Sequence, residues 1–197
     1  MTRFILLRTG ATDFDTEGRI KGTLNIPLND AGNEQALAAA NALREENVSV
    51  VYHSPSECDE QTAKVVAEAL GLRAKVVKDL QNLDQGLWQG KLVEELREKQ
   101  KKVYKQLQEQ PETVCPPGGE MVAEAQIRVK HAIDKLIKRH RKRVVVIVTS
   151  EPLTSLLHSY LSQKALGDLW GSVCDCGTWL SIDVEPKQLA TMVANQT

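Results

Sequence analysis

Arg3-Phe4-Ile5-Leu6-Leu7-Arg8-Thr9-Gly10-Ala11-Thr12 is the stretch that decides the fold of this chain. Its apolar part, residues 4–7, is too short for a helix and is followed by an arginine and a glycine, a pattern typical of a buried strand that ends at a turn. In open α/β sheets, ligands bind at the carboxyl ends of the strands. We therefore expect Arg8, Thr9 and Gly10 to lie at a ligand site.

Beyond this stretch, predicted strands alternate with predicted helices. The sequence predicts strands over residues 48–52, 74–77, 144–148 and 178–184, and helices over residues 29–46, 58–70, 92–110, 121–140 and 152–161. Such alternation favours right-handed βαβ units and a mostly parallel sheet with helices on both faces, which is an α/β fold. A chain of 197 residues forms one core by default, so a single domain over residues 1–197 is expected.

The composition excludes several classes of partner. The formal net charge is −1, so bulk electrostatics do not favour binding to nucleic acid or to a membrane surface. The apolar run Val144–Val148 is far shorter than the ~20 residues of a membrane span, and no secretory signal is visible, so a cytoplasmic location is expected. The basic run Lys138–Arg143 is either an anion-binding patch or a solvated helix end; we favour the second, because cations stabilise helix C-termini.

Further motifs fall in order along the expected strand ends. They are Gly18-Arg19, Gly22 and Pro27-Leu28, then His53-Ser54-Pro55 with Gln61-Thr62-Ala63, then Leu80, Gly86, Trp88 and Gly90, then Pro117-Gly118-Gly119-Glu120, and finally residues 147–150. Together they resemble the landmarks of the histidine phosphatase (phosphoglycerate mutase) superfamily over nearly the whole chain. The resemblance implies a three-layer phosphoglycerate mutase-like fold.

The resemblance also implies a two-step phosphoryl transfer. In the family, a histidine after the first strand attacks phosphorus, two arginines and a second histidine hold the phosphoryl oxygens, and a carboxylic acid protonates the leaving oxygen. An imidazole is a good nucleophile near neutral pH, and fixed cations stabilise the charge of the transferring group. A positioned acid prevents the departure of a free alkoxide.

Most of these groups are replaced at the matching positions of this chain. Arg8 remains, whereas the nucleophile matches Thr9, the second arginine matches Cys58, the acid matches Asn82, the second histidine matches Ser150 followed by Glu151, and a phosphate-contacting asparagine matches Asp15. We therefore expect a degenerate site at these seven positions with no intact catalytic set. The candidates for ligand binding are Arg8, Thr9 and His53.

The charges at these positions lead to a prediction about function. Asp15, Asp59 and Glu151 would repel a phosphate dianion, and one of them would pair with Arg8 instead. We therefore expect a catalytically inactive pseudophosphatase that binds a protein partner or a small ligand in a binding or regulatory role, with a homodimer left open. The alternative is an active phosphomonoesterase or mutase-like enzyme that uses relocated catalytic groups.

Several rescues of activity are weaker alternatives. His53 could act as the base for Thr9 or attack phosphorus itself, and Cys58 could act as a phosphatase thiolate, although its segment lacks a glycine and carries Lys64 where an arginine belongs. A metal held by Asp15, His53 and Glu151 has no local ligand spacing, and Cys174-Asp175-Cys176 lacks partners for zinc. We expect no metal and no cofactor.

The expected helix over residues 92–110 is strongly charged. It is either a lid over the pocket mouth or a solvated surface helix, and we favour the second, because a charged exterior is typical of surface helices.

Overall fold

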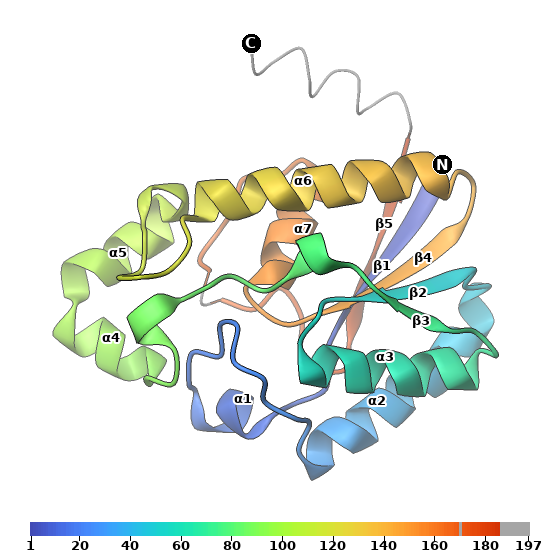
Figure 1. Ribbon diagram of the computed structural model, residues 1–197, viewed down its shortest axis with the longest axis horizontal. Helices are drawn as coiled ribbons and strands as arrows, with labels where there is room; N and C mark the ends of the chain where they lie inside the picture. Colours follow the sequence, from blue (N-terminus) through green and yellow to red (C-terminus); the bar gives the residue numbers. More distant parts are fainter. Residues whose placement is uncertain (170, 186–197) are drawn as a thin grey trace.

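A five-stranded sheet of order β3-β2-β4-β1-β5 organises the computed structural model, which describes residues 1–169 and 171–185 (Figure 1). The strands are β1 (Thr2–Arg8), β2 (Val50–His53), β3 (Ala74–Val76), β4 (Val144–Thr149) and β5 (Trp179–Val184). The pairs β3–β2, β2–β4 and β4–β1 are parallel, whereas β5 pairs with β1 in the antiparallel direction. The mostly parallel sheet predicted from the sequence is confirmed.

Helices cover both faces of this sheet. The helices of the described residues are α1 (Asp13–Glu17), α2 (Asp30–Ala42), α3 (Glu57–Ala69), α4 (Val93–Lys99), α5 (Lys101–Glu109), α6 (Val122–Arg139) and α7 (Leu153–Ser162). Short 3₁₀ turns lie at Leu43–Glu46, Lys78–Leu80, Gly86–Trp88 and Pro111–Thr113. In Figure 1, α6 and α7 lie above the strands, and α2 and α3 lie below them. The three-layer α/β fold is thereby confirmed.

The alternation of side chains along β1 explains why the sheet is covered twice. Phe4 and Leu6 belong to the apolar cluster that contains residues of α6 and α7, whereas Ile5 and Leu7 belong to the cluster formed with α2 and α3. All four side chains are fully buried. Successive side chains of a strand point to opposite faces, so a continuous apolar run requires cover on both sides.

The helix expected over residues 92–110 is two helices. α4 ends at Lys99 and α5 begins at Lys101, because Gln100 adopts φ −126° and ψ 47° and breaks the helix. No glycine or proline marks this break, so the sequence pattern could not show it. α4 nevertheless reaches the ligand end of the sheet, since its first residue, Val93, lines the pocket described below.

Two further expectations concern membranes and the chain end. Within the described residues, none of the helices combines the length and apolar character that a bilayer crossing requires. The polar tail expected beyond Glu185 lies outside the described residues.

Candidate functional site

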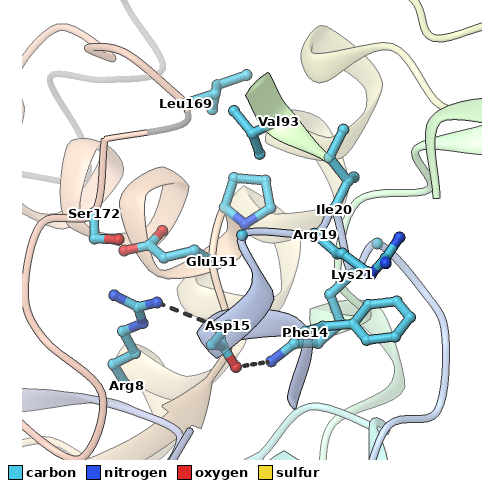
Figure 2. A pocket seen from close by; sticks show the side chains of 13 residues that line it. Arg8, Phe14, Asp15, Arg19, Ile20, Lys21, Val93, Glu151, Leu169 and Ser172 are labelled. Carbon is cyan, nitrogen blue, oxygen red and sulfur yellow. Dashed lines mark hydrogen bonds and ion pairs between the residues drawn. The ribbon is translucent and has the colours of Figure 1, made fainter. Parts of the chain in front are cut away.

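A cavity of about 160 Å³ opens at the carboxyl ends of β1 and β4 (Figure 2). Its charged lining consists of Arg8, Asp15, Arg19, Lys21 and Glu151. Its apolar lining consists of Phe14, Ile20, Val93, Pro152 and Leu169. The pocket therefore lies where ligands bind in open α/β sheets, and it combines a charged part with an apolar part.

Two cations converge on Asp15 in this pocket. Lys21 Nζ lies 2.9 Å from Asp15 Oδ2, and Arg8 Nη2 lies 3.4 Å from Asp15 Oδ1. Both cations are largely buried, with 12% of the Arg8 side chain and 6% of the Lys21 side chain exposed. The second Arg8 nitrogen, Nη1, donates to the carbonyl oxygen of Cys174 at 2.8 Å. Arg8 is thus fixed from two sides.

The turn after β1 positions Asp15. Thr12 is the N-cap of α1, and its backbone N–H and hydroxyl donate to Asp15 Oδ2 at 2.9 and 2.6 Å. Asp15 also donates its backbone N–H to the Thr12 hydroxyl, which completes a capping box. This local motif turns the Asp15 carboxylate back over the end of β1, toward Arg8.

The burial of this cluster and its charges act in opposite directions on the pKa values. Burial disfavours the ionised Asp15 carboxyl, but the Lys21 ammonium and the hydrogen bonds from Thr12 outweigh it and lower the pKa of Asp15. Burial also disfavours the ammonium of Lys21, but the Cys58 sulfur and the Asp15 carboxylate raise the pKa of Lys21. Both groups are therefore charged at neutral pH.

A buried carboxyl group, Asp59, lies beneath this charged layer. The hydroxyls of Ser56 and Ser150 donate to its oxygens at 2.6 and 2.8 Å, and the Ser54 hydroxyl donates as well. Burial raises the pKa of Asp59, against the effect of the three hydroxyls. Asp59 is thus a hydroxyl-bound group that takes up a proton more readily than an exposed aspartate.

Cys58 connects the two layers. Its Sγ lies 3.9 Å from Lys21 Nζ and 3.5 Å from Ser150 Oγ. Burial and the neighbouring Asp59 raise the pKa of the Cys58 thiol. A thiolate nucleophile at Cys58 is therefore disfavoured, and Lys64 cannot activate it, because Lys64 pairs with Glu60 at the surface.

The remaining residues singled out from the sequence lie around the pocket. Thr9 is buried, and its hydroxyl forms a hydrogen bond with the Thr62 hydroxyl on α3 at 2.9 Å. Asn82 donates to the carbonyl oxygens of Gly22 and Glu151, both at 3.0 Å, and so joins two pocket segments. His53 Nδ1 lies 2.7 Å from the Ser54 carbonyl oxygen, and its side chain does not line the pocket.

The metal alternative also finds no support in the geometry. In residues 1–169 and 171–185, histidine, cysteine and acidic side chains form no group of three or more with the spacing of a metal site. Asp15, His53 and Glu151 are therefore not brought together as ligands.

Sequence reasoning missed Lys21. Lys21 lies in the segment Gly18-Arg19-Ile20-Lys21-Gly22, of which only Gly18-Arg19 and Gly22 entered the family resemblance. The segment nevertheless follows the strand that leads to the ligand site, and it contains two cations. Gly18 and Gly22 have φ values of 68° and 57°, and these left-handed turns return the segment to the pocket. Of the family's cations, the sequence keeps Arg8 alone, and the structure adds Lys21 as a second buried cation of the site.

The fold and the pocket define a class of protein: an α/β protein with a charged pocket, lined by cations and carboxylates, at the carboxyl ends of its parallel strands. The family model of the histidine phosphatase superfamily (branch 1) matches residues 4–197, and the chain belongs to this family.

Named relatives support the same assignment. Phosphoserine phosphatase 1 of Hydrogenobacter thermophilus is 30% identical over 197 residues, which cover 100% of this chain and 93% of that protein. A metal-independent phosphoserine phosphatase of Arabidopsis thaliana is 29% identical over 168 residues, which cover 84% of this chain and 71% of that protein.

Solved structures share the fold. The alpha-ribazole phosphatase from Shigella flexneri superimposes with a TM-score of 0.80 at 25% identity, over 94% of this chain and 92% of that one. A mycobacterial glucosyl-3-phosphoglycerate phosphatase in complex with VO3 gives a TM-score of 0.83 at 24% identity, over 92% of both chains.

These findings correct the functional expectation drawn from the sequence. The relative that matches the whole chain is named as a phosphatase, as is the second relative. An inactive pseudophosphatase is therefore contradicted, and an active phosphatase is favoured. The physical error lay in the charge balance, which counted Asp15, Asp59 and Glu151 against Arg8 alone and left out the Lys21 ammonium.

Proposed function

We propose that this chain is a phosphomonoesterase that hydrolyses small phosphate esters with relocated catalytic groups. One observation carries the proposal: two buried cations, Arg8 and Lys21, converge in one pocket at the strand ends. The phosphatase names of the relatives support the same reaction class.

Arg8 and Lys21 are the groups that would hold the phosphoryl oxygens. A guanidinium offers paired donors that match phosphate geometry, and an ammonium adds a compact charge. Asp15 neutralises one of the two charges and keeps both cations in place before the substrate binds. Fixed donors of this kind stabilise a transferring phosphoryl group without reorganisation during the reaction.

Ser150 and Asp59 are the proposed nucleophile and base. Among the hydroxyls at the family's catalytic positions, Thr9 faces another hydroxyl, whereas Ser150 donates to a carboxyl group at 2.8 Å. A raised pKa makes Asp59 a better proton acceptor at neutral pH. Ser150 is 1% exposed and does not line the pocket, so the reaction requires a local rearrangement that opens Ser150 to the bound phosphoryl group.

The proposed reaction has two steps. Ser150 Oγ forms a bond to phosphorus as the bond from phosphorus to the ester oxygen breaks, Asp59 takes the hydroxyl proton, and water protonates the leaving oxygen. A water molecule then forms a bond to phosphorus as the bond from phosphorus to Ser150 Oγ breaks, and Asp59 returns its proton to Ser150 Oγ. The attacking water passes one proton to the hydroxide that the first step leaves, and inorganic phosphate departs.

The test is hydrolysis of p-nitrophenyl phosphate and O-phosphoserine by the purified chain. Arg8→Ala should lower kcat/KM by about 10²–10³-fold, as expected for the loss of a donor to the transferring group. Arg97→Ala is the matched control, because Arg97 forms an exposed ion pair with Glu94. No turnover of either ester by the wild-type chain, or equal turnover by Arg8→Ala, would overturn the proposal.

The nucleophile has its own test. Ser150→Ala should abolish turnover, and acid quenching of the wild-type reaction should trap phosphate on Ser150, identified by peptide mass spectrometry. Ser56→Ala is the control, because Ser56 donates to the same carboxyl group at 2.6 Å and has no role as a nucleophile. Full activity of Ser150→Ala would show that Ser150 is not the nucleophile. The proposed role of Arg8 in phosphate binding would then still be decided by Arg8→Ala.

A further inference from the structure

Glu151 is a carboxylate that lines the pocket without a cationic partner. Among the described residues it forms no ion pair within 4.0 Å, whereas Asp15 has two. Figure 2 shows its carboxylate near Ser172, on the same side of the pocket as the Arg8 guanidinium. The pocket therefore presents a carboxylate that has no ion-pair partner among the described residues, close to the group that would hold phosphate.

The hydrogen bonds of Glu151 fix its side chain and leave capacity to accept another. Oε2 accepts from the Ser155 backbone N–H at 3.0 Å and from the Ser155 hydroxyl at 2.8 Å, and Oε1 accepts from the Val173 N–H at 3.2 Å. A carboxylate has about four acceptor positions. One position on Oε1 thus remains for a donor from a ligand, on a side chain that is already oriented.

A phosphate ester bound at Arg8 would be repelled by this carboxylate if its organic group carried no positive charge. An ammonium on the organic group changes the sign of the interaction, because it forms a charge-assisted hydrogen bond with Glu151 while the phosphate contacts the cations. The two ends of the pocket then select for a zwitterionic ligand, and the charge of Glu151 becomes a source of specificity.

The size of the pocket limits the rest of the ligand. A cavity of about 160 Å³ is smaller than the ~300–1,000 Å³ of pockets for drug-sized molecules. The apolar side chains of Val93, Pro152 and Leu169 line it and suit a short alkyl chain. Polar groups beyond the ammonium would have few partners on this apolar part.

We infer that the substrates are small amino phosphates, in which a short carbon chain joins a phosphate ester to an ammonium, and that Glu151 is the residue that selects for the ammonium. This inference rests on the proposed phosphomonoesterase function and names its substrate class. Arg8 and Lys21 bind the phosphoryl end, and Glu151 binds the amino end.

The test compares O-phosphoethanolamine with propyl phosphate, which have the same number of non-hydrogen atoms and differ in a terminal ammonium or methyl group. The wild-type chain should prefer O-phosphoethanolamine in kcat/KM by about 10- to 100-fold, as expected for a hydrogen bond to a charged group. Glu151→Gln should bring this ratio near one, by weakening O-phosphoethanolamine and by improving propyl phosphate. Glu112→Gln, at an exposed position away from the pocket, should keep the wild-type ratio.

Ser155→Ala separates charge from side-chain support. It removes one hydrogen bond to Glu151 Oε2 and keeps the carboxylate, so the preference for O-phosphoethanolamine should persist. If Glu151→Gln does not fold, the ratio of kcat/KM values of the wild-type chain for the two esters decides the inference, and a ratio of one overturns it.

The outcomes distinguish this inference from the proposed function. Equal turnover of both esters by the wild-type chain overturns the selection for an ammonium and leaves the proposed phosphomonoesterase function in place. The same conclusion follows if a folded Glu151→Gln variant keeps the wild-type ratio of kcat/KM values for the two esters. If neither ester is turned over but p-nitrophenyl phosphate is, the inference is overturned and the phosphomonoesterase stays in place. If p-nitrophenyl phosphate is not hydrolysed either, the phosphomonoesterase fails, and calorimetric titration with the same two compounds decides the inference. Binding of O-phosphoethanolamine that depends on Glu151 then supports it, and equal or absent binding of both compounds overturns it.

Discussion

Replacing Lys21 with methionine should destabilise the chain, because it leaves the Asp15 carboxylate with one cation in place of two. Lys21 Nζ is the nearer cation, at 2.9 Å, and its side chain is only 6% exposed. Methionine matches the length of the apolar part of lysine, so the change removes the charge without opening a large cavity. The loss is therefore mainly electrostatic.

The contacts of Asp15 set the size of this effect. Removing one member of a buried ion pair typically costs about 3–5 kcal/mol. Here the cost should be reduced to roughly 2–3 kcal/mol, because Arg8 and Thr12 still contact a carboxylate that is 19% exposed. For a chain of this size, ~1 kcal/mol corresponds to about 2–4 °C in Tm, so the midpoint should fall by roughly 4–12 °C.

The assay is urea unfolding of the wild-type chain, Lys21→Met, Asp15→Asn and the double variant at neutral pH. Asp15→Asn should remove most of the cost of Lys21→Met, with a coupling free energy of about 1–3 kcal/mol. Lys64→Met is the control, because Lys64 pairs with Glu60 in the exposed i,i+4 geometry and should cost only about 0.3–0.5 kcal/mol.

The pH dependence gives a second check on the same pair. The pKa of Asp15 is lowered in the folded state, so its contribution is fully present above about pH 4 and is lost as the pH falls through the folded pKa. The difference between the wild-type chain and Lys21→Met should therefore shrink in acid. A Lys21→Met variant as stable as the wild type at neutral pH, or a cost unaffected by Asp15→Asn, would refute the reasoning.

Three further predictions concern the surroundings of the site. Gly10→Ala should cost about 3 kcal/mol or more in urea unfolding, because its Cβ would collide with the Gly32 backbone. The free energy of unfolding of Asp59→Asn should increase relative to that of the wild type as the pH rises above about 4. Burial raises the pKa of Asp59, so its ionisation opposes folding in the wild type, and urea unfolding at acidic and at neutral pH measures the difference. Tyr52→Phe should cost about 1–3 kcal/mol by the same assay, because His140 Nε2 loses its 2.8 Å partner and its Nδ1 has no hydrogen-bond partner in the described part of the chain.

The strands and layers could be predicted from the sequence because they follow from local patterns. The run at residues 4–7 is apolar at every position, and this pattern alone requires cover on both faces. The break at Gln100 could not be predicted, since no glycine or proline lies there and both flanking segments favour helix. The elements of the fold could thus be predicted wherever apolar periodicity or a turn residue marks them in the sequence.

The site was harder to predict from the sequence than the fold. Its charged residues come from segments that come together only in the tertiary structure. Asp15 was expected near Arg8 from its place in the opening loop, and the ion pair is present at 3.4 Å. Lys21 was overlooked, because its entry into the pocket depends on the left-handed turns at Gly18 and Gly22. A sequence lists the charges of a loop, but the backbone of that loop decides which of them face a ligand.

Lys21 also shows why matching single positions misjudges this site. The family resemblance implies two arginines, and Cys58 stands at the position of the second. Cysteine is short enough for the Lys21 ammonium to lie 3.9 Å from its sulfur, in space that an arginine side chain at position 58 would occupy. A cation lost from α3 is thus restored from the loop after α1, so the pocket keeps two buried cations, Arg8 and Lys21, although the motif keeps one. The property that phosphate binding requires is the charge and its position, and neither depends on which segment of the chain supplies it.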